Sequence, residues 1–178
     1  MGQRWLDLRI VISLAGNMGE LDDDRFAIWG ESMAAANGPG DSTMVPHDLE
    51  QPKHAEPIGA TLSSLAGAES LARAVVARGG LVSYRSVLDS PFVHVPHDAL
   101  PVNVFRAGNL PDVWAHLAPK PLRLEGLVDG TNRRVTGERL EKALMPVTEA
   151  YKKGGLVVKE DYTPDAELAK WIVEQLKR

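Results

Sequence analysis

Apolar and polar residues alternate along this chain in two distinct patterns. Short apolar runs bounded by glycine, proline or aspartate predict strands, and apolar residues spaced three and four apart predict helices. Strands are predicted at residues 25–29, 72–78, 121–128 and 156–159. Helices are predicted at residues 5–14, 57–68, 112–117, 137–151 and 163–176, with a shorter one near 83–89. Because alternating strands and helices are typical of parallel sheets, we predict an α/β fold, with a mostly parallel sheet of about four strands flanked by helices.

The first predicted helix differs from the others because apolar residues occupy most of its circumference. A helix of this kind is normally surrounded by protein, so we expect residues 5–14 to be well buried. The 178 residues fit a single domain, residues 1–178, with no room for two large ones.

The composition excludes several classes of function. The net charge is −4, the isoelectric point is about 5.7 and like charges form no block, so we expect neither a nucleic-acid nor a membrane partner. The absence of cysteine excludes disulfides, thiolate metal sites and a cysteine nucleophile. No apolar stretch approaches the roughly 20 residues of a membrane span, and Arg4, Asp7 and Arg9 interrupt the apolar core that a signal peptide needs. We therefore expect a soluble, cytoplasmic protein.

The segment Gly30-Glu-Ser-Met-Ala34 follows the apolar run Phe26–Trp29 and places Ser32 where a strand ends. Serine nucleophiles are commonly mounted on a strained turn between a strand and a helix, with small residues two positions to either side. Gly30 and Ala34 meet that requirement, so Ser32 is a candidate nucleophile. The alternative is an ordinary serine after a strand. Residues 36–52, rich in glycine, proline, aspartate and histidine, delay the helix that such a turn should start.

The predicted topology brings the candidate catalytic residues to one edge of the sheet. Right-handed crossovers place the carboxyl ends of parallel strands at the same edge, which gathers Ser32, the 79–110 connection and Asp129. A carboxylate there can orient a catalytic base. Asp129 also precedes Gly130, and Asp-Gly is a strong turn signal by itself, so a turn role is the alternative.

A serine nucleophile needs a base within hydrogen-bond reach. The chain has five histidines. His54 and His97 lie in loops that can fold over the carboxyl edge and are the leading candidates, and His47 is a weaker one. The helical pattern around His116 indicates a structural role. His94, His97 and the aspartate after His97 could suggest a metal site, but such spacings are common by chance, and we predict no metal.

Two strings carry a resemblance to a known family. Arg25-Phe-Ala-Ile-Trp-Gly-Glu-Ser-Met and Leu110-Pro-Asp-Val-Trp-Ala-His-Leu-Ala-Pro-Lys-Pro-Leu-Arg-Leu resemble the α/β-hydrolase superfamily, in particular its acetylxylan-esterase-like branch. The likeness covers the C-terminal half of such an enzyme. It implies that Ser32 is the nucleophile, that Asp129 is the triad acid and that the Met33 N–H donates to the oxyanion. It also implies a small-molecule ester substrate, a short-chain or acetyl ester such as those of sugars, hydrolysed without a cofactor.

The chain departs from the family pattern in two ways. The family places its catalytic histidine after the last strand, but no histidine follows His116, and residues 159–163 read Lys-Glu-Asp-Tyr-Thr. The loop that supplies the second oxyanion donor is also missing, and losing one such donor costs on the order of 100- to 1000-fold in turnover. Two hypotheses therefore stand. The first is a serine esterase with a rearranged histidine, and the second is a catalytically degenerate hydrolase-like domain used for binding or assembly.

The strand before Ser32 also predicts assembly. In the family sheet this strand has a neighbour on each side, whereas here residues 26–29 form an open apolar edge, which proteins normally cover or pair. We therefore expect a homo-oligomer, a dimer that buries either this edge or the apolar first helix.

Overall fold

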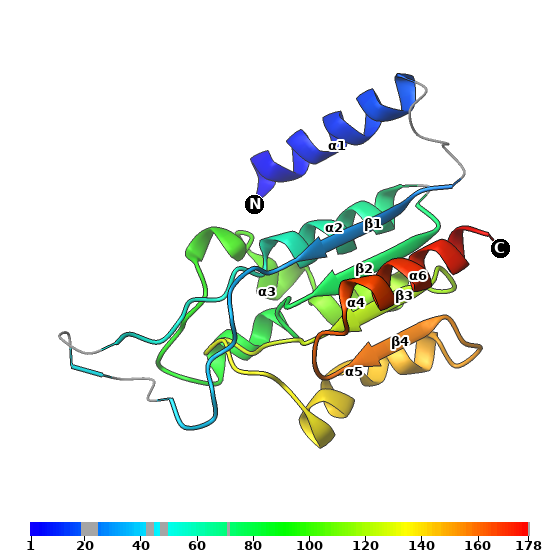
Figure 1. The fold of residues 1–178 in the computed structure, drawn as a ribbon. Coiled ribbons are helices and arrows are strands. Elements are labelled where there is room, and N and C mark those ends of the chain that lie inside the picture. The colour runs from blue at the N-terminus through cyan, green and yellow to red at the C-terminus, as the bar shows by residue number, and fades with distance from the viewer. Residues whose placement is uncertain (19–24, 42–44, 47–49, 71, 178) are drawn as a thin grey trace.

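A four-stranded, all-parallel sheet lies at the centre of the molecule (Figure 1). The computed structural model describes residues 1–18, 25–41, 45–46, 50–70 and 72–177. The strands are β1 (Ala27–Glu31), β2 (Ala74–Arg78), β3 (Leu122–Glu125) and β4 (Leu156–Lys159), and they lie side by side in that order. The predicted α/β fold is confirmed.

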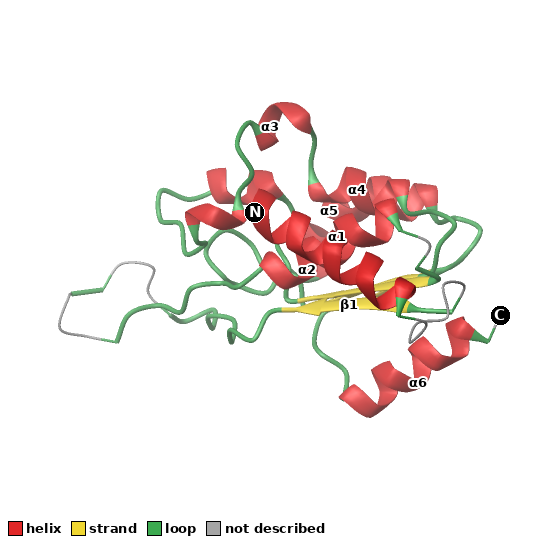
Figure 2. Cartoon of the chain, turned by 90° about the horizontal axis from the view of Figure 1, so that it is seen from above, coloured by secondary structure: helices red, strands yellow, loops and turns green. Residues whose placement is uncertain are grey.

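The helices cover the two faces of the sheet unequally. Because the strand order follows the chain order, right-handed crossovers bring successive connections to the same face. That face carries α1 (Gly2–Asn17), α2 (Ile58–Glu69), α3 (Val104–Ala107), α4 (Leu110–His116) and α5 (Gly137–Ala150) (Figure 2). Among the described helices, only α6 (Asp165–Leu176) lies on the other face. The 81–110 connection contains two short 3₁₀ helices, Tyr84–Leu88 and His97–Ala99.

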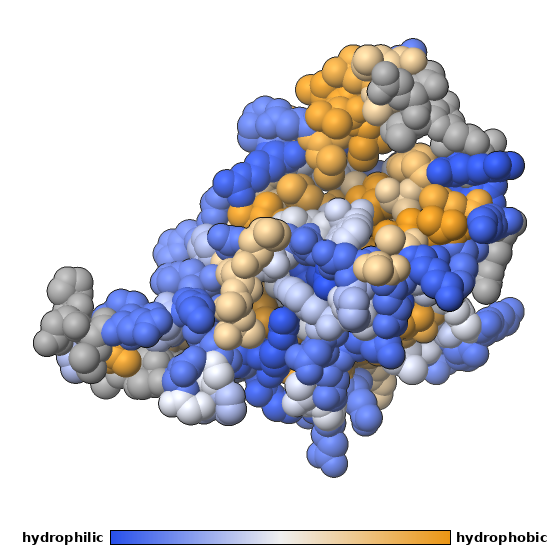
Figure 3. All heavy atoms as spheres, viewed as in Figure 1, coloured by the Kyte–Doolittle hydropathy of each residue, from blue (hydrophilic) through white to orange (hydrophobic). Residues whose placement is uncertain are grey.

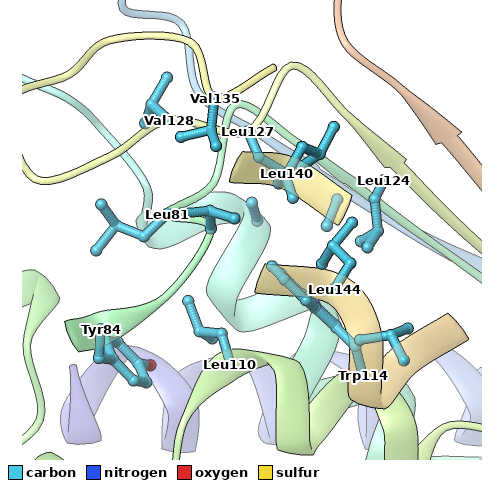
Figure 4. Packing of buried hydrophobic residues seen from close by; sticks show 14 of the residues in the cluster. Leu81, Tyr84, Leu110, Trp114, Leu124, Leu127, Val128, Val135, Leu140 and Leu144 are labelled. Carbon is cyan, nitrogen blue, oxygen red and sulfur yellow. The ribbon is translucent and has the colours of Figure 1, made fainter. Parts of the chain in front are cut away.

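The main hydrophobic core lies between the sheet and the helices α2, α4 and α5 (Figure 4). The second strand is buried along its whole length, as expected for a central parallel strand covered on both faces. Trp114 of α4 is fully buried, and its Nε1 donates to Ser64 Oγ of α2 at 2.8 Å. Close packing of β1 on α2 depends on glycine, because a Cβ at Gly30 would overlap the Gly59 carbonyl.

A buried ionic network holds the opposite face of the sheet against the loop before α6. Glu125 of β3 is 0% exposed, and its carboxylate lies 2.6 Å from Arg123 Nε and 3.2 Å from Arg78 Nε. The backbone N–H of Thr163 donates to this carboxylate at 3.1 Å, and the Thr163 hydroxyl donates at 2.8 Å. Each arginine also pairs with carboxylates nearer the solvent: Glu31 and Asp165 with Arg78, and Glu167 with Arg123.

The prediction that the first helix is well buried is wrong. None of the residues of α1 is buried, and four of its apolar residues are half exposed or more: Leu6, Ile10, Val11 and Leu14. The helix lies at the margin of the molecule, beyond α2 (Figure 1). An apolar circumference indicates that a helix needs covering, but it does not say that the same domain supplies the cover.

The other predicted elements are confirmed with shifted ends. The third strand stops at Glu125, three residues earlier than predicted, and the following Gly126 adopts a φ of +56°, which ends the extended backbone. The strand at 156–159 has the predicted bounds.

Candidate functional site

Ser32 lies at the carboxyl edge of the sheet, directly after β1, as predicted. Its backbone N–H donates to the Arg78 carbonyl at 3.0 Å, which extends the pairing of β1 with β2 by one residue. Its hydroxyl accepts a hydrogen bond from the Ala34 N–H at 3.3 Å. The side chain is enclosed, since Ser32 is only 5% exposed.

The strained strand-to-helix turn predicted at Ser32 is not formed. The next helix after β1 in the described chain is α2, which begins at Ile58. Non-glycine residues with positive φ, within the described ranges, are Asn103 and Asn132. After Ser32 the chain continues as a loop because Gly38, Pro39 and Gly40 disfavour a helix. Hydrogen bonds from asparagine side chains hold this loop in place.

Two buried asparagines hold the loop after Ser32 against the rest of the carboxyl edge. Asn37 Nδ2 donates to the carbonyls of Lys53 at 2.9 Å and Thr131 at 3.0 Å, and Asn37 Oδ1 accepts from the Lys53 N–H at 2.8 Å. Asn132 Nδ2 donates to the carbonyls of Ala35 at 3.0 Å and Lys53 at 3.1 Å. The start and the end of the β1–α2 connection and the turn at residues 131–132 are thereby joined into one layer. Sequence reasoning missed both asparagines.

Asp129, the predicted triad acid, organises its own turn. One carboxylate oxygen, Oδ1, accepts from the Thr131 N–H at 2.9 Å, the Thr131 hydroxyl at 2.7 Å and the Arg133 N–H at 3.2 Å. The other oxygen lies 3.3 Å from the Arg139 guanidinium. This is the side-chain-to-backbone pattern of an aspartate turn, which is the alternative role that the Asp-Gly pair indicated.

The candidate base His54 follows Lys53 in this loop layer, whereas His97 lies in the 81–110 connection. The exposed His54 ring stacks on the buried His94 ring, with centroids 5.6 Å apart. The backbone of His94 accepts from Ala55 and donates to Gly130, both at 2.8 Å, so it links the loop of His54 to the turn of Asp129. His97 is exposed at the start of a 3₁₀ helix.

Within the described residues, the side chains of His54 and His97 make no hydrogen bond with Ser32 or Asp129. His47 lies outside the described residues. His116 is exposed in the last turn of α4. Met33, the predicted oxyanion donor, follows Ser32 with its side chain 82% exposed.

Tyr162 covers the ends of the central strands and was not singled out by the sequence. It lies in the loop after β4, where the family resemblance would place a histidine, and its hydroxyl donates to the Ser32 carbonyl at 3.3 Å. The ring lies between two guanidiniums, 4.5 Å from that of Arg78 and 4.3 Å from that of Arg134. Gly79, with a φ of +66°, leaves room for the phenol, because a Cβ there would overlap the Tyr162 hydroxyl.

Burial displaces the pKa of three other side chains. It raises the pKa of Tyr84 to about 12 and raises that of Tyr151 further, and it lowers the pKa of Lys120. Lys120 precedes β3 and donates to the carbonyls of Gly67 and Ser70, so it lies at the amino end of that strand, away from Ser32. These shifts accompany buried structural contacts and do not identify a catalytic group.

The described part of the chain offers neither a metal site nor a membrane-spanning helix. No group of three or more histidine, aspartate or glutamate side chains in the described part of the chain could hold a metal ion. None of the described helices is long and apolar enough to cross a membrane. No family model, curated protein or solved structure matches the chain.

Proposed function

We propose that this chain is a non-catalytic binding domain, built on a hydrolase-like α/β scaffold, that acts by associating through an apolar surface on α1. One observation carries the proposal. Leu6, Ile10, Val11 and Leu14 of α1 are 50%, 57%, 59% and 54% exposed, and large contiguous apolar surfaces on folded proteins mark interaction sites.

The orientation of α1 separates an inner side from this outer side. Trp5 and Ile12 are partly buried and line the space between α1 and α2. Two ion pairs on exposed side chains connect α1 to the domain: Arg4 with Asp98 at 3.1 Å and Arg9 with Glu69 at 3.8 Å. The outer side therefore faces away from the described part of the domain and is open to contact with a binding partner (Figure 3).

The groups expected to perform catalysis have other contacts, which also supports a binding role. The Asp129 carboxylate is occupied by its own turn and by Arg139. Ser32 is enclosed beneath the loop that carries Tyr162. Hydrolysis would require the loops over Ser32 to move apart and a histidine to approach its hydroxyl.

A serine esterase remains the second candidate, and the position of Ser32 favours it. Ligands of parallel α/β sheets bind at the carboxyl ends of the strands, which is where Ser32 lies. In this alternative Ser32 attacks a short-chain ester, a loop histidine, His54 or His97, takes its proton, and water hydrolyses the acyl-enzyme without a cofactor.

Hydrolysis of p-nitrophenyl acetate and butyrate separates the two candidates. We expect wild type, Ser32→Ala, His54→Ala and His97→Ala to give the same background rate. Ser13→Ala, at an exposed position of α1, is the matched serine control, and circular dichroism checks that each variant is folded. A rate that falls at least tenfold in Ser32→Ala and is unchanged in Ser13→Ala would overturn the proposal and establish the esterase.

A further inference from the structure

We propose that Asn37 is a modification site, where opening of a loop layer leads to irreversible loss of the side-chain amide and prevents the layer from closing again. The loop layer consists of the start and the end of the β1–α2 connection and the turn at residues 131–132. Asn37 precedes Gly38, and this is the only Asn-Gly pair in the sequence. The layer so defined includes no residue of α1, so this site and the proposed function are tested separately.

The chemistry of an Asn-Gly pair converts the side-chain amide into a carboxylate without an enzyme. The Gly38 backbone nitrogen attacks Cγ of Asn37, and a base removes the proton from that nitrogen. The bond from Cγ to Nδ2 then breaks, and ammonia leaves with the proton. Water opens the resulting cyclic imide and leaves an aspartate or an isoaspartate at position 37. Glycine favours the attack because it has no side chain to obstruct the ring.

The Asp41 carboxylate is placed to act as the base. Its Oδ2 accepts from the Gly38 N–H at 2.6 Å, and this is the proton that must be removed. The Asp41 N–H donates back to the Gly38 carbonyl at 3.2 Å, so the contact belongs to a local turn. Because this turn does not depend on distant segments, the base stays beside the nucleophile when the layer opens. A positioned base contributes about 100- to 10,000-fold in rate.

The closed layer protects the amide. Asn37 is only 7% exposed, its Nδ2 donates to the carbonyls of Lys53 and Thr131, and its Oδ1 accepts from the Lys53 N–H. Ammonia leaves from Nδ2, so the two hydrogen bonds that this nitrogen donates must break before the reaction is complete. Asn132 supports the same arrangement, because its Nδ2 donates to two carbonyls of the β1–α2 connection. Local opening that breaks these bonds therefore exposes the Asn-Gly pair to reaction.

The product cannot take the place of the amide. A carboxylate at position 37 has no proton for the carbonyls of Lys53 and Thr131, and its oxygen would face them as another acceptor. The position is nearly enclosed, and burial of an unpaired charge is strongly unfavourable. Reaction at Asn37 therefore leaves the layer open at the loop that follows Ser32.

The rate of reaction at Asn37 in the full chain tests this inference. Asn132→Gly removes two hydrogen bonds of the layer and suits the φ of +58° at that position. We expect it to convert Asn37 at least tenfold faster than wild type, measured by mass spectrometry of the tryptic peptide 26–53, in which Asn37 is the only asparagine. Asp41→Asn keeps an acceptor for the turn but supplies no base, so in the Asn132→Gly background it should slow the reaction at least tenfold.

Limited trypsin digestion tests the product. Asn37→Asp reproduces it, and the Lys53 carbonyl, which accepts from both asparagines in the closed layer, is then released. We expect cleavage after Lys53 to be at least tenfold faster in Asn37→Asp than in wild type. Asn103 is exposed and has a φ of +61°, close to that of Asn132, so Asn103→Gly and Asn103→Asp are the matched controls. Circular dichroism checks that each variant is folded.

Each outcome decides the inference. Faster conversion of Asn37 in Asn132→Gly, its dependence on Asp41, and faster cleavage after Lys53 in Asn37→Asp support it. Conversion that is no faster in Asn132→Gly than in Asn103→Gly, or that is unaffected by Asp41→Asn, would overturn it. Cleavage after Lys53 that is no faster in Asn37→Asp than in Asn103→Asp would overturn it as well, even where Asn132→Gly does not fold.

Discussion

Removing the Glu125 carboxylate should strongly destabilise the domain. This side chain is fully buried and is the shared partner of Arg78 and Arg123, whose side chains are only 5% and 4% exposed. In Glu125→Ala two buried guanidiniums lose a common counter-charge, and two hydrogen bonds from Thr163 lose their acceptor. Loss of one partner from a buried ion pair costs about 3 to 5 kcal/mol.

The structure places the expected loss near the lower end of that range. Arg78 keeps its contacts with Glu31 at 2.9 Å and Asp165 at 2.8 Å, and Arg123 keeps Glu167 at 3.3 Å. We therefore expect the free energy of unfolding to fall by about 3 kcal/mol in Glu125→Ala. Glu125→Gln keeps one acceptor oxygen and should lose about half as much.

Urea unfolding followed by circular dichroism measures the loss. With an m value of about 2 kcal/mol/M, the midpoint of Glu125→Ala should fall by about 1.5 M. All variants are compared at one protein concentration, because association stabilises the folded state. Glu174→Ala, at an exposed position of α6, is the matched control and should change stability by less than about 0.5 kcal/mol. A loss below about 1 kcal/mol in Glu125→Ala would refute the reasoning.

Three further predictions concern the carboxyl edge and the core. Gly79→Ala should destabilise by about 2 kcal/mol, because its Cβ meets the Tyr162 hydroxyl at a φ of +66°, and Tyr162→Phe should restore part of that loss in a double-mutant cycle. Burial raises the pKa of Tyr84 from 10.0 to about 12, so its contribution is complete below pH 10 and is lost as the pH rises through about 12. Tyr84→Phe should therefore weaken the alkaline loss of stability, measured by urea unfolding between about pH 8 and 12, and an unchanged pH profile would contradict this. Asp129→Asn keeps the acceptor of the turn, so it should lose only about 1 kcal/mol in urea unfolding and leave ester hydrolysis unchanged.

The sequence predicted the order and type of the regular elements because these depend on local periodicity. The strand at 156–159 and the helix that ends at Leu176 follow from the spacing of apolar residues within each segment. The same reasoning placed Ser32 at the carboxyl edge, since the end of a strand can be recognised locally. Its catalytic role stays a prediction.

The arrangement above Ser32 could not be predicted because its contacts join distant segments. Tyr162 reaches Ser32 across 130 residues, and Asn132 reaches Ala35 across 97. The signal that the sequence did offer was a glycine directly after each of the two central strands, Gly79 and Gly126. In the structure both glycines have a positive φ, and the ring of Tyr162 lies against them. The burial of α1 was predicted wrongly because periodicity describes one helix and carries no information on which molecule covers it.

The molar mass of the chain in solution tests most directly whether α1 joins two copies. Size-exclusion chromatography with light scattering should give twice the 19.3 kDa of one chain for wild type, and 19.3 kDa for Ile10→Asp, whose carboxylate would interrupt the apolar surface of α1. Val102→Asp, at a position 89% exposed and outside α1, should stay at twice the chain mass. A wild type that remains at 19.3 kDa up to about 50 µM, or an Ile10→Asp variant that remains dimeric, would contradict the account.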